Sequence, residues 1–287
     1  MTERTRAHER LTERPLAGFA RSVPGPDGRP VDILIPARTR SRNEFDLVIH
    51  FHGAAWLAHQ AVDSRGDGAV SAVVNLGAGS GAYHRAFSDP AVFDSLLVHI
   101  ALEVSAARVR PSRIRLLTLV GFSAGHGAIR VILREPRQAA RVQRVLLLDG
   151  MHTSYEPEGR PLAADGLLDT MNLVAFRDFA RVAIRGDKSF VITNSEIFPG
   201  TFASTTETAD WLLESLGLRR TPVLKWGPRG MQQLSEVHAG SFSVLGYAGN
   251  TAPDHIDHLH AMPEPLARVQ MINMIGGRVA GITEHRE

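Results

Sequence analysis

Apolar and polar residues alternate along this chain with two periods, one typical of strands and one typical of helices. Short apolar runs that end in glycine or a polar residue predict buried strands at 45–53, 69–77, 114–120, 144–150 and 189–195, with two later strands at 222–227 and 241–249. Helical spacing predicts helices at 91–108, 127–142, 166–184 and 205–217, the last with threonine capping candidates, and a helical tail around the prolines of 254–275.

The order of these elements indicates an α/β fold. Strands that alternate with helices favour a mainly parallel sheet covered on both faces. Residues 18–38 predict an antiparallel hairpin around the turn sequence "PGPDG", and the Gly/Ser-rich segment 78–90 predicts a loop. We expect residues 1–15 to form a flexible arm and residues 16–287 to form one domain without a large cap.

The helix predicted at 91–108 should bury one broad apolar face. The spacing assigns five residues to this face: Phe93, Leu96, Leu97, Ile100 and Leu102.

Composition removes several classes of function. The chain has 287 residues, 44% of them hydrophobic and 22% charged, which is ample for a large core. The net charge is only +2 and the arginines are scattered, so no nucleic-acid partner is expected. The absence of cysteine excludes disulfides and thiolate chemistry. No signal peptide or membrane span is predicted, which favours a cytoplasmic location.

The most informative motif is "GFSAG" at 121–125. It matches G-x-S-x-G and lies directly between a predicted strand and a predicted helix. Gly121 and Gly125 leave room for the strand and helix to close around Ser123, whose hydroxyl would project above the sheet edge. In this arrangement the start of the helix aims backbone N–H groups at the same point. The sequence here resembles the α/β-hydrolase superfamily, well over residues 45–150 and more loosely over 189–287.

The resemblance implies that Ser123 is a nucleophile and that two backbone N–H groups hold the reacting oxyanion. One donor would be Ala124, after the serine. The second should follow a strand that ends in His-Gly, and "VIHFHGAAW" has that form. Ala54 is the assigned donor, with Gly53 or Ala55 as alternatives. The superfamily often has several glycines in this loop, whereas this chain has only Gly53.

The resemblance also places the catalytic histidine after the last strand, within "DHIDHLH" at 254–260. His255 is the first choice, because it lies nearest the preceding loop, with Asp254 as a possible helix cap. His258 and His260 remain alternatives. The same segment suggests a metal site, but the sequence offers no distant third ligand, so no metal and no cofactor are predicted.

The acid that orients the histidine is harder to choose. Asp149 ends the run "RVLLLD", and Glu196 follows "FVITNS". Either carboxylate would stabilise the imidazolium of the histidine. Asp149 is favoured over Glu196, and Asp187 and Asp210 are weaker alternatives.

Together these features predict a serine hydrolase that cleaves a small carboxylic ester through an acyl-enzyme on Ser123, His255 and Asp149. The alternatives are a peptidase, amidase or acyltransferase on the same triad, a non-catalytic relative that binds a ligand, or metal-dependent hydrolysis at 254–260. The partner would be a small-molecule acyl substrate; the sequence does not specify its acyl group, its alcohol or the oligomeric state. Four further features are candidates for the cleft or for plain packing: Trp56, His126, His152 and the loop 198–211.

Overall fold

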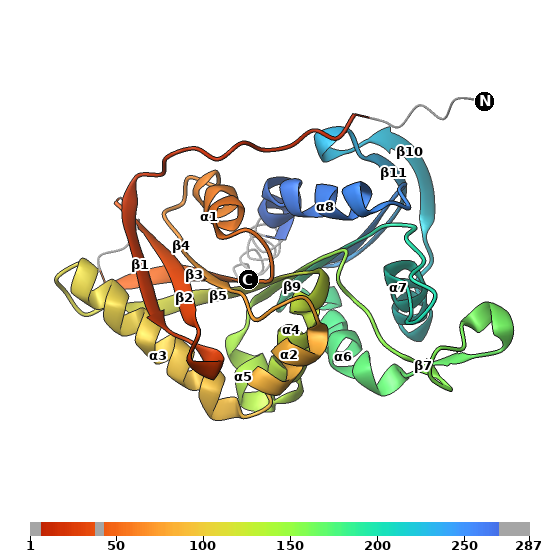
Figure 1. The fold of residues 1–287 in the computed structure, drawn as a ribbon, viewed down its shortest axis with the longest axis horizontal. Coiled ribbons are helices and arrows are strands. Elements are labelled where there is room, and N and C mark those ends of the chain that lie inside the picture. Colours follow the sequence, from red (N-terminus) through yellow and green to blue (C-terminus); the bar gives the residue numbers. More distant parts are fainter. Residues whose placement is uncertain (1–6, 38–42, 270–287) are drawn as a thin grey trace, which may run out of the picture.

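The computed structural model of the protein describes residues 7–37 and 43–269. A ten-stranded sheet runs through the molecule in the order β1-β2-β4-β3-β5-β6-β9-β12-β11-β10 (Figure 1). Its six central strands, from β4 to β12, are parallel, and the strands added at both ends are antiparallel. The predicted α/β fold with a mostly parallel sheet and an N-terminal antiparallel hairpin is therefore confirmed.

The strands lie close to the ranges that the apolar runs predict. They are β1 Gly18–Pro24, β2 Pro30–Pro36, β3 Glu44–Phe51, β4 Val70–Val74, β5 Arg113–Phe122, β6 Arg144–Leu148, β9 Ser189–Asn194, β10 Thr221–Trp226, β11 Gln232–Ala239 and β12 Phe242–Tyr247. A separate two-stranded sheet pairs β7 Tyr155–Glu156 with β8 Leu167–Leu168.

Helices cover both faces of the sheet (Figure 1). They are α1 Ala55–Asp63, α2 Ser80–Ala86, α3 Pro90–Ala107, α4 His126–Arg134, α5 Pro136–Arg141, α6 Val174–Ile184, α7 Thr205–Ser215 and α8 Ala252–His260. Alternate residues of β6 enter two different core clusters: Val145 and Leu147 pack with α3, α4 and α6, whereas Leu146 and Leu148 pack with α1 and α8. This alternation is what a strand buried on both faces requires.

Several elements differ from the sequence prediction. Helix α2 lies in the segment 78–90 that predicted a loop, and strand β11 was not predicted. The helix predicted at 127–142 is divided into α4 and α5, because Pro136 starts a new helix and disfavours helical backbone at Glu135. The segment predicted as one helix at 166–184 contains β8 and a short 3₁₀ turn before α6.

The buried face of α3 also needs one correction. Phe93, Leu96, Leu97 and Ile100 are buried as predicted, but Leu102 is 63% exposed and Val104 takes its place. At 3.6 residues per turn Leu102 points away from the face that carries Ile100. By length and composition alone, α3 is long and apolar enough to span a membrane, whereas the sequence predicted no membrane span. In the structure its buried face packs into the core.

The described part of the N-terminal arm runs along the surface of α1 and α8 (Figure 1). The N–H of Leu11 donates to Nδ1 of His260 at 3.0 Å, and the N–H of Arg14 donates to Oε1 of Gln60 at 3.1 Å. The flexibility of this arm stays a prediction. The helical tail is observed as α8 and as residues 263–269, and the rest of that predicted segment lies outside the described residues.

Candidate active site

Ser123 lies at a sharp turn between β5 and α4. Its backbone φ is +47°, a left-handed conformation that is unusual for a residue with a side chain. The flanking glycines are required by space: a Cβ on Gly125 would lie 2.1 Å from the carbonyl oxygen of Phe51, and one on Gly121 would lie 3.0 Å from Cδ1 of Ile129. The turn thus holds the serine in the strained backbone conformation that the motif "GFSAG" predicts.

Asp149 and His255 lie side by side, 106 residues apart in the chain. Nδ1 of His255 is 2.7 Å from Oδ2 of Asp149. A carboxylate only accepts hydrogen bonds, so the imidazole donates its Nδ1–H to it. Nε2 of His255 is therefore the nitrogen that is free to accept a proton.

Asp149 is held rigidly at the end of β6. It is 1% exposed, and its oxygens also accept hydrogen bonds from the N–H of Ser195 (2.8 Å), Oγ of Ser195 (2.8 Å) and Oγ1 of Thr205 (2.6 Å). Burial alone would raise the pKa of Asp149, but the electrostatic influence of His258 and the hydrogen bonds from His255 and Thr205 lower it well below its usual range. Asp149 therefore remains an anion at neutral pH.

Two contacts place Ser123 beside this pair. The ring of Phe122, the residue before Ser123, stacks on the ring of His255 with 4.6 Å between centroids. Gly150, the residue after Asp149, packs so closely on the turn that a Cβ there would lie 2.7 Å from the backbone nitrogen of Ser123. The structure therefore brings Ser123, His255 and Asp149 together at the carboxyl ends of the central strands β5 and β6.

The loop between β3 and α1 distinguishes among the candidate oxyanion donors. The N–H of Gly53 donates to Oδ1 of Asn75 at 2.9 Å, and Nδ2 of Asn75 donates back to the carbonyl of Gly53 at 2.9 Å. The backbone N–H and the carbonyl of Gly53 are thus both used in hydrogen bonds to Asn75. Ala54 follows it in extended backbone conformation immediately before α1, and Ala124 follows Ser123. This geometry favours Ala54 over Gly53 as the partner of Ala124.

The structure separates the other candidate acids from His255. Glu196 is exposed, and its backbone N–H donates to the carbonyl of Gly249. Asp187 pairs with Arg185, and Asp210 pairs with Arg220.

The other histidines of "DHIDHLH" have different partners from His255. Nδ1 of His258 lies 2.8 Å from Oγ1 of Thr193 in the interior, and His260 lies next to Trp56 and the arm. The cap of α8 is Thr251 and not Asp254, which instead completes a capping box as the third residue of the helix.

A cavity of about 560 Å³ opens beside Ser123. His126 and His152 line it with rings 5.6 Å apart, and Phe202, from the loop before α7, packs against His152. Burial lowers the pKa of His126 to about 3, so its ring is neutral at neutral pH. Trp56 does not line this cavity and packs instead against the core cluster under α1 and α8.

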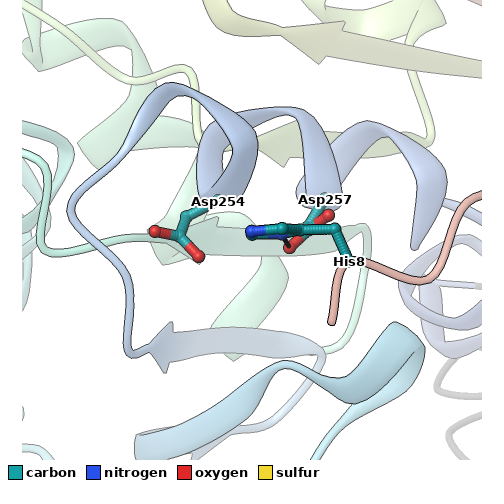
Figure 2. A group of neighbouring side chains, drawn as sticks. All are labelled: His8, Asp254 and Asp257. Carbon is teal, nitrogen blue, oxygen red and sulfur yellow. Dashed lines mark hydrogen bonds and ion pairs between the residues drawn. The ribbon is translucent and has the colours of Figure 1, made fainter. Parts of the chain in front are cut away.

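A second titratable cluster lies where the arm meets α8: His8, Asp254 and Asp257 have ligand atoms within 4.8 Å of one another (Figure 2). Nδ1 of His8 is 2.8 Å from Oδ2 of Asp257, and Nη1 of Arg10 is 2.9 Å from Oδ1 of the same carboxylate. Oδ2 of Asp254 accepts bonds from the cap of α8. We interpret this cluster as the ionic attachment of the arm to α8, because Arg10 already supplies a cation there.

The fold is similar to that of solved esterases. An ester hydrolase from the metagenome of Lake Arreo, complexed with a derivative of bipyridine phosphonate, is 13% identical over 93% of this chain and 86% of that chain, with a TM-score of 0.50. The chain has the α/β-hydrolase fold.

Two other solved structures lie at TM-scores of 0.47. A Pyrobaculum calidifontis esterase is 11% identical over 92% of this chain and 86% of that chain, and a feruloyl esterase module of Clostridium thermocellum is 11% identical over 90% and 95%. No family model and no curated protein matches the sequence. At such low identity, the α/β-hydrolase assignment describes the fold and leaves the activity to be argued from the site.

Sequence reasoning missed the residues that surround Asp149. Ser195 stands directly before Glu196, and Thr205 was noted only as a capping candidate, whereas the cap of α7 is Ser204 in a capping box with Glu207. One signal was available for Ser195: it follows β9, and parallel strands that are neighbours end at the same edge of a sheet. The hydrogen bond from Thr205 depends on where α7 packs, which the local sequence does not reveal.

Proposed function

We propose that the protein is a serine hydrolase that cleaves carboxylic esters through an acyl-enzyme. The observation that carries this proposal is the hydrogen bond between His255 and the buried Asp149, beside a serine in a left-handed turn. Asp149 orients the ring of His255 and stabilises its protonated form, while the turn presents Oγ of Ser123 to the cavity.

The first half of the reaction forms the acyl-enzyme. Nε2 of His255 takes the proton of Ser123 as Oγ attacks the ester carbonyl carbon and forms a C–O bond. The N–H groups of Ala54 and Ala124 hold the negative charge that develops on the carbonyl oxygen. The tetrahedral intermediate then breaks its bond to the alcohol oxygen, which leaves with the proton from His255.

The second half restores the enzyme. Water attacks the acyl carbon while Nε2 of His255 takes its proton, and the bond to Oγ of Ser123 breaks. His255 returns the proton to Ser123, and the carboxylic acid is released. Every proton therefore moves through one ring nitrogen, while Nδ1 keeps its hydrogen bond to Asp149.

A fluorophosphonate probe tests this proposal directly. We expect the wild type to be labelled at Ser123 and to hydrolyse p-nitrophenyl acetate, and Ser123→Ala to lose both properties. Ser88→Ala, which removes an exposed hydroxyl outside the cavity, is the matched control and should keep both properties. Absence of labelling in folded wild type would refute the serine mechanism, and turnover that persists in Ser123→Ala would refute the nucleophile.

A further inference from the structure

The cavity beside Ser123 extends along one side of α4. Ser123, His126 and Arg130 line it, and their spacing of three and then four residues places them in one stripe along the helix. The opposite walls come from the start of α2, from 152–154 after β6, from Asn172 and from the loop that carries Phe202. Arg130 is seven positions after Ser123, so their backbones are roughly 10 Å apart along the helix. One cavity is therefore lined by Ser123 and, about two helical turns further along, by Arg130.

Arg130 is a buried cation without a buried anion. It is only 8% exposed, and its one hydrogen bond within the described residues runs from Nη2 to Nδ1 of His84 at 3.1 Å. Its Nε is fully buried with no hydrogen-bond partner, and no carboxylate of the described chain lies within ion-pair distance of its guanidinium. Burial lowers the pKa of Arg130 to about 10, which still leaves it charged at neutral pH.

Two other arginines with buried side chains provide a comparison for Arg130. Nη2 of Arg65 forms an ion pair with Asp67. Arg144, like Arg130, has a buried Nε without a hydrogen-bond partner and no ion pair among the described residues, although Asp46 and Asp67 favour its charge. An isolated buried charge is costly unless something pairs with it. Arg130 differs from Arg65 and Arg144 because it faces a cavity that a ligand can enter.

Two carboxylates lie in the neighbourhood of Arg130 without forming an ion pair with it. Glu158 lines the same cavity but is exposed. Asp169 raises the pKa of Arg130, but its influence is smaller than those of burial and of Arg134, which lower this pKa. The carboxylate of Asp169 accepts hydrogen bonds from Nδ2 of Asn172 and from Oγ of Ser154. His84 is kept neutral because burial and the nearby arginines lower its pKa, so it accepts from Arg130 and does not neutralise it.

We propose that the cavity binds esters that carry a carboxylate at the end remote from the scissile bond, and that Arg130 binds this carboxylate. This inference rests on the proposed function of Ser123. A guanidinium matches a carboxylate through two parallel hydrogen bonds, and Nη1 together with the second N–H of Nη2 forms such a pair of donors. The substrate supplies the anion that the described chain does not supply, and its charge fixes which end lies at Ser123.

The experiment compares matched anionic and neutral esters. On the acyl side we would use mono-p-nitrophenyl esters of glutarate, adipate and suberate, each with its methyl-capped neutral counterpart. On the alcohol side we would use the butyrate ester of a carboxymethylphenol and its methyl ester. In the wild type we expect a higher kcat/KM for the anionic member of at least one series, and the series that shows it tells which side of the ester carries the carboxylate.

Variants of Arg130 then test its part in this preference. Arg130→Gln should lower the ratio of anionic to neutral kcat/KM by about 10- to 100-fold, the range expected for a charge-assisted hydrogen bond. Arg130→Lys should restore part of the ratio, because it keeps the charge but not the paired donors. Arg137→Gln, which removes an exposed arginine outside the cavity, is the matched control and should leave the ratio unchanged. A wild-type ratio near one in both series, or a ratio that Arg130→Gln does not alter, overturns the proposal.

A binding measurement does not depend on whether Arg130→Gln folds, because it uses only the wild type and Ser123→Ala. It does not depend on catalysis either, because Ser123→Ala lacks the nucleophile. Adipate should raise the melting temperature of Ser123→Ala and compete with p-nitrophenyl butyrate in the wild type, whereas dimethyl adipate should do neither. Equal effects of adipate and its dimethyl ester overturn the carboxylate site. Failure of the wild type to hydrolyse any ester, with adipate still binding, instead overturns the proposed function and leaves the anion site standing.

Discussion

His255 donates its Nδ1–H to Asp149 across 2.7 Å, at the ends of two elements that are 106 residues apart in the chain. Asp149 lies at the end of β6, whereas Glu196 follows β9, the next strand in the sheet. The position after β9 nevertheless takes part in the site, because Ser195 donates both its N–H and its Oγ to Asp149. The two strand ends therefore cooperate in holding one carboxylate.

Asp149→Asn tests the choice of acid. The amide offers its own donor to Nδ1 of His255 and cannot stabilise the imidazolium, so kcat should fall on the order of 10³- to 10⁴-fold. Glu196→Gln is the matched control and should retain the activity of the wild type, because its side chain is exposed. The measurement is steady-state hydrolysis of p-nitrophenyl acetate by folded variants. A large loss in Glu196→Gln with a mild effect of Asp149→Asn would reverse the assignment.

Gly150→Ala tests the close packing of the turn against the end of β6. The added Cβ would meet the backbone nitrogen of Ser123 at 2.7 Å and its carbonyl oxygen at 2.8 Å, so Ser123 must move. A shift of this kind should lower kcat by about 100-fold, because it displaces the nucleophile.

The control for Gly150→Ala lies in a helix. Gly81→Ala in α2 meets only the end of a flexible arginine side chain, and it should be neutral or slightly stabilising. The measurements are kcat and the melting temperature for both variants. Full activity in Gly150→Ala would show that the turn tolerates the displacement.

The buried His50 predicts a loss of stability in mild acid. His50 is 1% exposed, and neither ring nitrogen has a hydrogen-bond partner among the described residues. Burial lowers its pKa in the folded state to about 3, from 6.5 for the unfolded chain. The unfolded state therefore binds more protons below pH 6.5, and the free energy of unfolding falls as the pH falls toward 3. Between pH 6.5 and 4.5 this single residue costs about 2–3 kcal/mol.

The check is the free energy of unfolding by urea at pH 7.5, 6.5, 5.5 and 4.5. His50→Leu should show a shallower fall with acid than the wild type, whatever its stability at pH 7.5. His99→Gln, which changes a partly exposed histidine on α3, should keep the slope of the wild type. Parallel slopes in the wild type and in His50→Leu would contradict the prediction.

Arg10→Ala tests the attachment of the arm to α8. Arg10 forms an ion pair with Asp257, whose side chain is completely buried, so its removal leaves that carboxylate with less compensation. We expect the free energy of unfolding to drop by about 1–3 kcal/mol, between the effects of exposed and fully buried ion pairs.

Arg14→Ala is the control for the arm. Arg14 is exposed and Asp63 is partly exposed in this ion pair, and its loss should change the free energy of unfolding by less than about 1 kcal/mol. Urea midpoints measured at pH 7.5 give both values. Equal small effects would show that the arm does not contribute to the stability of the folded chain.

Local sequence determined the central strands, most of the helices between them and the turn at Ser123. Apolar periodicity and glycine spacing act over a few residues, so β5, the turn and α4 can be recognised without knowing where the rest of the chain lies. Two of the incorrect predictions also have local causes. Pro136 divided a helix that the apolar pattern runs through, and Leu102 was assigned to the wrong face of α3.

Tertiary structure alone decided which carboxylate meets the histidine and what the cavity contains. Asp149 and Glu196 both follow buried strands, and only the packing of α8 and α7 over the sheet edge brings His255 and Thr205 to the first of them. Arg130 looks like an ordinary polar position of α4, and its proposed role depends on its burial and on the absence, among the described residues, of a carboxylate within ion-pair distance of it. The physical reason is that hydrogen bonding and burial depend on distances between segments, and the sheet order sets those distances.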